Sequence, residues 1–278
     1  MPDRMAQALV LEAPRTLVAR ELALPEIGHD DGLLRVEACG LCGTDHELFT
    51  GVIAPGFRFV PGHEAVGTIA AIGEGAAKRW GVRKGDRVAV EVFLSCRACP
   101  ACQRGEYRRC DRHGLADMYG MISVERSPGL WGGYATYQYL HADSMVLPVP
   151  PGLPPELAVA FNPLGAGIRW GVTVPGTRAG DVVAVLGCGI RGLSTAAAAK
   201  EAGASFVVVT GAGEHDHPRL EQARRFGADL VVDVLAEDPV ARLRRETSGA
   251  GADVVVDVTA KAPTGFVQGL DLVRAGGT

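Results

Sequence analysis

Short apolar runs separated by turn-forming residues fill the first part of the chain. Between residues 5 and about 95, stretches such as MAQALVLEAP, LLRVEACG and AVGTIAAIG are rich in Val, Leu and Ala and are interrupted by Gly and Pro. Runs of this length are typical of strands in a compact β-rich domain. Only Thr44 to Phe49 has a helical pattern in this part, with Thr44 or Asp45 as the expected N-cap.

The pattern changes after residues 148–155, PVPPGLPP, a proline-rich segment that we interpret as a domain boundary. Beyond it, apolar runs such as VVAVL, FVVVTG and VVVDV alternate with helix-like stretches, which predicts a parallel, doubly wound sheet. We therefore expect an α/β protein with domains at residues 1–150 and 151–278, and a length of 278 residues also favours two domains. The chain ends at RAGGT, where another strand would normally follow, so we expect the C-terminal part of the sheet to be missing.

Four cysteines follow the spacing C-x2-C-x2-C-x7-C, at Cys96, Cys99, Cys102 and Cys110. Thiols this close together cannot all pair as unstrained disulfides, but four thiolates can close tetrahedrally on one zinc ion. So dense a cluster of a scarce residue disfavours the alternative of four incidental buried cysteines. We expect a structural zinc lobe at residues 96–110.

A second group of metal-binding side chains lies in the segment from residue 40 to residue 64. Soft and borderline ligands of this kind suit Zn²⁺ in a site that keeps one position open for substrate. We therefore predict a catalytic metal site, with its candidate residues Cys42, Thr44, His46, His63 and Glu64. For His46, a solvated position on a helix is an equally good interpretation.

The sequence GCGIRG at residues 187–192 follows a predicted strand and precedes an Ala-rich helix. In this context G-x-G-x-x-G binds the pyrophosphate of a dinucleotide, because the glycines allow a tight turn and a close approach, and the helix N-terminus offers free N–H groups. The predicted coenzyme contacts here are Gly187, Gly189, Ile190, Arg191 and Gly192.

The end of the next strand, FVVVTG, has Thr210 and Gly211 where an acidic residue usually binds the adenosine ribose of NAD. Without that carboxylate a 2′-phosphate is admissible, and the candidates to pair with it are His215, His217, Arg219 and Arg224. The pattern therefore favours NADP, with Glu214 reaching back to the ribose of NAD as the alternative.

The composition excludes several classes of function. A net charge of -4 leaves no surplus of Lys and Arg to neutralise a nucleic acid or an anionic membrane. The N-terminal apolar run is too short for a signal peptide, and later runs are too short to span a bilayer. We expect a cytoplasmic protein, in which seven cysteines indicate metal binding or catalysis rather than disulfides.

These motifs together resemble the zinc-dependent medium-chain alcohol dehydrogenase family over essentially all of the chain. GHEAVGTIAAIGEGA matches the family signature G-H-E-x2-G-x5-G, CGTD matches its first-ligand segment, and the four-cysteine lobe and GCGIRG fall where the family has its structural zinc and its coenzyme. CGTDHEL beside GHEAVG is most similar to the polyol, sugar and threonine dehydrogenase branch. The resemblance implies a GroES-like β-barrel catalytic domain, a Rossmann coenzyme domain and a homo-oligomer, either a dimer or a tetramer.

The resemblance also implies roles for individual residues. Cys42 and His63 correspond to catalytic zinc ligands, and Thr44 to the hydroxyl that takes the substrate proton. Many relatives draw a further anionic ligand from the helix after the linker, where this chain has Asn162, whose carbonyl oxygen is a poor substitute. We therefore expect Glu64 to complete the site together with water, with Asn162 as the other candidate metal ligand.

The sequence departs from the family at His46, because the relay histidine of many relatives sits one residue later, where this chain has Glu47. The predicted reaction is hydride transfer between an alcohol or polyol and NADP or NAD, in a cleft where the two domains meet. One alternative is a carbonyl or enoyl reductase without a firm catalytic zinc, and another is a non-catalytic, zinc-stapled dinucleotide-binding protein. The sequence leaves the identity of the substrate open.

Overall fold

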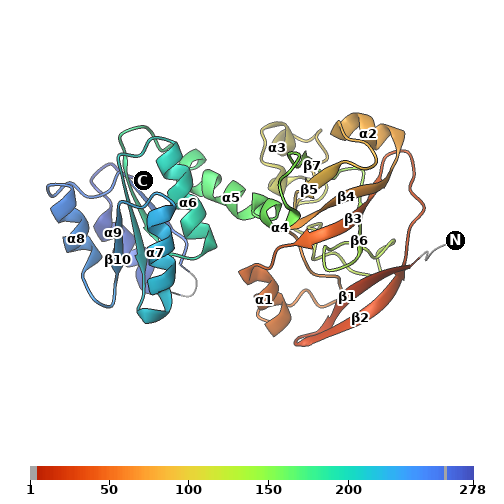
Figure 1. Ribbon diagram of the computed structural model, residues 1–278, viewed down its shortest axis with the longest axis horizontal. Helices are drawn as coiled ribbons and strands as arrows, with labels where there is room; N and C mark the ends of the chain where they lie inside the picture. The colour runs from red at the N-terminus through yellow and green to blue at the C-terminus, as the bar shows by residue number, and fades with distance from the viewer. Residues whose placement is uncertain (1–4, 260–261) are drawn as a thin grey trace. The chain divides into compact units, whose positions relative to one another are not determined.

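A computed structural model describes residues 5–259 and 262–278. The chain divides into two compact units, Met1–Phe161 and Asn162–Thr278 (Figure 1). The first unit, predicted as β-rich, contains antiparallel sheets, and the second contains the parallel sheet that the change of pattern predicted. None of the helices in the described part of the chain is long and apolar enough to cross a bilayer.

The first unit is built on a five-stranded antiparallel sheet in the order β6-β3-β4-β5-β7 and a separate hairpin of β1 and β2. Buried and exposed side chains alternate along most of β1, so that one face of this strand is buried. The five-stranded sheet packs on a core that includes Trp131, Tyr119 and Leu34. The strands are β1 (Met5–Ala13), β2 (Thr16–Ala23), β3 (Gly32–Cys39), β4 (Ala65–Ile72), β5 (Arg87–Val90), β6 (Tyr137–Leu140) and β7 (Val146–Pro148).

Short helices lie between these strands, and α1 and α3 carry or border some of the predicted site residues. They are α1 (Gly43–Thr50), α2 (Glu74–Trp80), α3 (Pro100–Gln103), the 3₁₀ turn η1 (Tyr107–Arg109) and α4 (Pro155–Ala158). The N-cap of α1 is Cys42, so the expectation of Thr44 or Asp45 was wrong. The reason is a capping box in which Cys42 and Asp45 each satisfy a backbone N–H of the other's turn.

The second unit is a four-stranded parallel sheet in the order β10-β9-β8-β11. Its strands are β8 (Val182–Leu186), β9 (Phe206–Gly211), β10 (Leu230–Asp233) and β11 (Val254–Asp257). The helical elements are α5 (Phe161–Ile168), the π-helical turn η2 (Arg169–Thr173), α6 (Ile190–Glu201), η3 (Glu214–Asp216), α7 (His217–Arg225), α8 (Pro239–Glu246) and α9 (Pro263–Leu272).

Both faces of this sheet are covered by helices, because alternate residues of each strand point to opposite sides. In β8, Val183 and Val185 join a core with residues of α6 and α7, whereas Ala184 and Leu186 join a second core with residues of α8 and α9 (Figure 1). This arrangement confirms the predicted doubly wound sheet. It places the turn between β8 and α6 at the carboxyl edge, where ligands of such sheets bind.

Candidate metal and coenzyme sites

The start of α1 holds the thiol of Cys42 in a fixed position. Its Sγ accepts a hydrogen bond from the backbone N–H of Thr44 at 3.3 Å, and its own N–H donates to Oδ2 of Asp45 at 2.9 Å. Asp45 is buried, with 5% of its surface exposed. The thiol is therefore oriented by the local turn of the chain rather than by distant packing.

His63, just before β4, completes a compact cluster with these residues. Its Nε2 lies 3.3 Å from Sγ of Cys42, and its Nδ1 lies 3.5 Å from Oδ1 of Asp45. In a tetrahedral zinc site a sulfur ligand and a nitrogen ligand lie about 3.5 Å apart. The spacing of Cys42 and His63 therefore fits one zinc ion, and Asp45 takes the outer position that carboxylates take behind metal-bound imidazoles.

The charges of this cluster also suit a metal ion. Burial opposes ionisation of Cys42, but His63 and the hydroxyl and N–H of Thr44 outweigh burial and lower the pKa of the thiol. Burial opposes protonation of His63, but Asp45 and Cys42 raise the pKa of the imidazole to about 10. In nearby Cys39, by contrast, burial raises the pKa to about 12. Cys42 is thus the more acidic thiol of the two. The imidazole of His63 holds a proton that a bound metal ion would replace.

The other predicted residues of this site lie at different places. His46 is exposed on α1, outside the cluster. Glu64 is buried, with its Oε2 only 2.1 Å from where a Cβ on Gly40 would stand, and its carboxylate is outside the group of ligand atoms within 4.8 Å of one another. Asn162 lies in α5 at the start of the second unit. The structure therefore brings Cys42, His63 and Asp45 together.

The four cysteines of the lobe converge as their spacing predicted. One sulfur atom from each lies within 4.8 Å of the others, and the Sγ atoms of Cys96 and Cys102 are 3.8 Å apart. Sulfur ligands of tetrahedral zinc lie about 3.7 Å apart. Burial opposes ionisation of Cys110, but backbone groups of Cys96, His113 and Arg112 outweigh burial and lower its pKa to about 6. The donor set fits a closed zinc site.

A buried ion network follows the lobe. The imidazole of His113 is 7% exposed, and its Nδ1 and Nε2 lie 2.8 Å from Asp117 and 2.7 Å from Asp143. Burial opposes protonation of His113, but the two carboxylates outweigh it and raise its pKa. His141 also lies close enough for a shared metal ion, but Arg112 lies 3.4 Å from Asp143. This group is already neutralised by its own cations, so we interpret it as a structural network.

This network anchors the polar segment after the lobe against the β domain. Tyr119 is buried, and its hydroxyl contacts Ser144 at 2.5 Å and accepts the N–H of His141 at 2.9 Å. A Cβ on Gly120 would lie 3.2 Å from Cβ of His63, so this segment forms the wall behind that imidazole.

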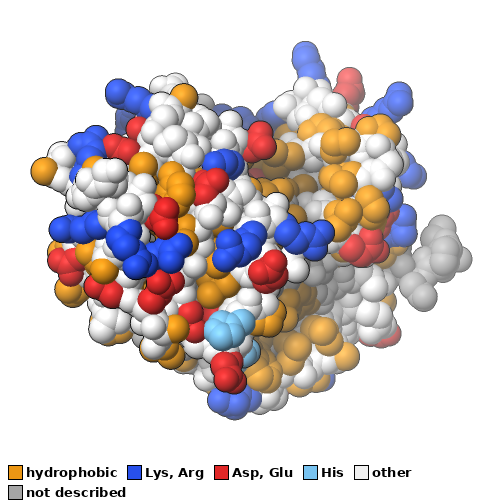
Figure 2. Space-filling view, turned by 60° about the vertical axis from the view of Figure 1, so that its left-hand side comes forward, with side chains coloured by type: hydrophobic (Ala, Val, Ile, Leu, Met, Phe, Trp, Pro, Cys, Tyr) orange, Lys and Arg blue, Asp and Glu red, His pale blue; other side chains and the backbone are white. Residues whose placement is uncertain are grey.

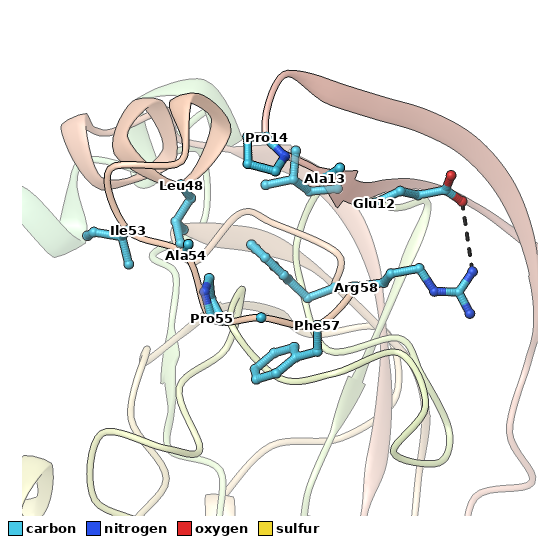
Figure 3. A pocket seen from close by; sticks show the side chains of 12 residues that line it. Glu12, Ala13, Pro14, Leu48, Ile53, Ala54, Pro55, Phe57 and Arg58 are labelled. Atoms are coloured by element: carbon cyan, nitrogen blue, oxygen red, sulfur yellow. Dashed lines mark ion pairs between the residues drawn. The ribbon is translucent and has the colours of Figure 1, made fainter.

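An apolar pocket of about 270 Å³ lies at the other end of α1 (Figure 3). Leu48, Ile53 and Phe57 line it, and Arg58 and Glu12 form an ion pair of 4.0 Å at its side. Cys42 and Leu48 belong to opposite ends of the same helix, so the pocket is a separate feature of the first unit.

In the second unit the glycine-rich turn has the shape that a dinucleotide needs. Gly187 has φ 103°, which favours glycine, and a Cβ on Gly192 would lie 1.9 Å from the carbonyl oxygen of Gly187. A Cβ on Gly189 would meet nothing within 4 Å, and Gly189 caps α6 without a side-chain hydrogen bond. The open space beside Gly189 therefore lies at the N-terminus of α6, where the backbone N–H groups of the first turn are free to bind a pyrophosphate. Ile190 and Arg191 are exposed there, with the Arg191 guanidinium 5.3 Å from the ring centroid of Trp170.

The basic residues predicted to bind a 2′-phosphate are mostly paired with acids. Nη1 of Arg219 donates to Oδ1 of Asp216 at 2.9 Å, and Nε2 of His217 lies 2.8 Å from Asp233. Arg224 lies 3.7 Å from Glu221. Across the face shown in Figure 2, Lys and Arg side chains are likewise interspersed with Asp and Glu.

Comparisons with known proteins agree with both units. Residues 28–151 match the model of the alcohol dehydrogenase GroES-like domain, and residues 192–278 match that of the zinc-binding dehydrogenase. A probable alcohol dehydrogenase of Mycobacterium tuberculosis is 69% identical over 274 residues, which are 99% of this chain and 74% of that protein. The chain belongs to the zinc-dependent medium-chain alcohol dehydrogenase family.

Other members of the family extend the comparison. An erythritol/L-threitol dehydrogenase of Mycolicibacterium smegmatis is 32% identical over 248 residues, covering 86% of this chain and 65% of that protein. A putative zinc-binding dehydrogenase from Sinorhizobium meliloti, solved bound to NADP, superposes with a TM-score of 0.83 at 30% identity, covering 99% of this chain and 75% of that one. The predicted fold, a GroES-like domain followed by a Rossmann domain, is confirmed.

Proposed function

We propose that this zinc-dependent dehydrogenase catalyses the reversible oxidation of an alcohol or polyol to a carbonyl compound with a nicotinamide coenzyme. The observation that carries the proposal is the spacing of 3.3 Å between Sγ of Cys42 and Nε2 of His63, with Asp45 on the far side of the ring. Names of relatives at 69% and 32% identity support alcohols and polyols as the substrate class.

Cys42 and His63 would hold the catalytic zinc ion, with Glu64 or Asn162 as the further ligand, and the four lobe cysteines would hold a second, structural ion. When bound, zinc polarises the alcohol oxygen and the coenzyme accepts a hydride. Thr44 is half-buried beside Cys42, and its hydroxyl is the group on this chain that can take the substrate proton. Gly189 and the N-terminus of α6 would bind the pyrophosphate.

The test combines metal analysis with a substrate panel. We expect two zinc ions per chain, and one zinc ion fewer in Cys110→Ser. With a simple alcohol or polyol as substrate, we expect the absorbance of the reduced coenzyme to rise as the alcohol is oxidised. Metal content without turnover of any alcohol or polyol would contradict the proposal.

We also propose a cytoplasmic location and a homo-oligomer. Size-exclusion chromatography with light scattering tests the second point.

A further inference from the structure

The end of β9 has no acidic side chain of its own, but a carboxylate from the following turn lies beside it. A Cβ on Gly211 would stand 2.9 Å from Sγ of Cys188 and 3.1 Å from Cβ of Asp216. The position that a side chain at the strand end would take is therefore already filled by Cys188, Leu220 and the Cβ of Asp216. The carboxylate of Asp216 lies just beyond the strand end, where it accepts the N–H of Ala212. We propose that Asp216 reads the adenosine ribose in place of a strand-end acid and selects NAD(H) over NADP(H).

The turn that carries Asp216 is tied down at several points. Its Oδ2 accepts the backbone N–H of Ala212 at 2.9 Å, and its own N–H donates to the carbonyl oxygen of Gly213 at 2.9 Å. The N–H of Gly213 in turn donates to Asp233 at 2.8 Å. The side chain of Asp216 is 22% exposed, so the carboxylate is fixed in position and still accessible to a ligand.

The charge at this position discriminates between the two coenzymes. Burial opposes ionisation of Asp216, but the N–H of Ala212, the guanidinium of Arg219 and the thiol of Cys188 outweigh it and lower the pKa of the carboxyl. A carboxylate there can accept a hydrogen bond from a ribose 2′-hydroxyl, and its ion pair with Arg219 keeps that guanidinium from a 2′-phosphate. Arg219, which the sequence offered as the partner of that phosphate, is already paired with Asp216. The geometry thus reverses the preference that the strand-end residues suggested.

This inference rests on the proposed function only in that a nicotinamide dinucleotide binds. The test is therefore equilibrium binding of NAD⁺ and NADP⁺ to the zinc-loaded protein by titration calorimetry, without any alcohol. We expect the wild type to bind NAD⁺ at least about ten-fold more tightly, because Asp216 accepts from the 2′-hydroxyl and holds the guanidinium of Arg219, which could otherwise pair with a 2′-phosphate. Asp216→Asn keeps an oxygen that accepts from Ala212, and it should reduce the NAD⁺ preference about ten-fold or more, chiefly by tightening NADP⁺.

Two further variants make the assignment specific. Asp216→Asn should free the guanidinium of Arg219 to pair with the 2′-phosphate of NADP⁺. Adding Arg219→Ala to this variant should therefore remove the NADP⁺ affinity that Asp216→Asn gained. Glu214→Gln, an exposed acid in the same turn, should leave the ratio unchanged. Tighter binding of NADP⁺ by the wild type, an unchanged ratio in Asp216→Asn, or a shift in Glu214→Gln instead would overturn the assignment while the proposed function stands. Binding of neither coenzyme would contradict both.

Discussion

Oδ1 of Asp45 lies 3.5 Å from Nδ1 of His63, on the side of the ring opposite to Cys42. A carboxylate in this position keeps the proton on Nδ1 and leaves Nε2 free to bind a metal ion. The relationship links the N-terminal turn of α1 to His63 in the segment just before β4, so one buried acid both caps the helix and orients the imidazole.

The first prediction concerns this acid. Asp45→Asn should weaken zinc binding at the Cys42 site by about 10- to 100-fold, because the amide is a poorer acceptor for the imidazole N–H. The measurement is zinc retained per chain against a graded chelator. The lobe zinc should be retained as in the wild type.

Asp86→Asn is the matched control for Asp45→Asn. Oδ2 of Asp86 accepts the N–H of Arg83 at 2.9 Å, a bond of the same kind as that between Asp45 and Cys42. If both variants lost zinc equally, the effect would come from general loosening of the domain rather than from the imidazole.

A second prediction addresses the further zinc ligand. Glu64→Gln should lower zinc occupancy at the Cys42 site if the carboxylate turns away from Gly40 and toward the metal. Asn162→Ala should have little effect, since a neutral amide oxygen is a weak zinc ligand. Unchanged occupancy in Glu64→Gln together with a loss in Asn162→Ala would show that the amide is the ligand.

A third prediction separates two glycines of the coenzyme turn. Gly192→Ala should destabilise the second unit and lower its melting temperature, because the new Cβ would meet the carbonyl oxygen of Gly187 at 1.9 Å. Gly189→Ala should leave stability nearly unchanged, since its Cβ meets nothing within 4 Å, yet weaken coenzyme binding because that space belongs to the pyrophosphate. Normal coenzyme affinity in folded Gly189→Ala would place the dinucleotide elsewhere.

A fourth prediction concerns the pH dependence of the His113 network. The folded-state pKa of His113 is raised, so the stabilisation by its charged form is fully present below the ordinary value of about 6.5 and is lost as the pH rises through the raised value. His113→Asn should therefore cost about 2 kcal/mol of unfolding free energy at pH 6 and progressively less at alkaline pH.

Urea unfolding of the zinc-loaded proteins at several pH values measures this difference. The exposed residue His215 provides the control, and His215→Asn should show no comparable dependence. A penalty for His113→Asn that is constant from pH 6 to pH 9 would mean that the ring acts through packing rather than through charge.

The sequence predicted those parts of the sites whose members lie close together in the chain. The four lobe cysteines span residues 96–110, and GCGIRG lies between one strand and the next helix, so local spacing was sufficient for both. The succession of strand-like and helix-like runs also predicted the parallel sheet of the second unit, whereas for the first unit the sequence predicted only a β-rich domain and not the antiparallel pairing of its strands.

The sequence did not reveal residues whose partners are brought close only by folding. Asp45 was predicted only as a helix cap, and its approach to His63 depends on the folding that brings the start of α1 close to the segment before β4. The conformation of the turn after β9 likewise decides that Asp216, rather than Glu214, borders the Cβ position of Gly211. A signal for Asp45 was present in its capping-box spacing from Cys42, but that spacing alone indicates only a helix start.

Among the described residues, every cluster able to hold a metal ion belongs to the first unit, and the glycine-rich turn belongs to the second. Each unit also has hydrophobic cores of its own. A ligand that binds only the folded state stabilises the part that it binds. Zinc binding would therefore stabilise the first unit and coenzyme binding the second, so that chelation and coenzyme removal would lower the stability of different parts of the molecule.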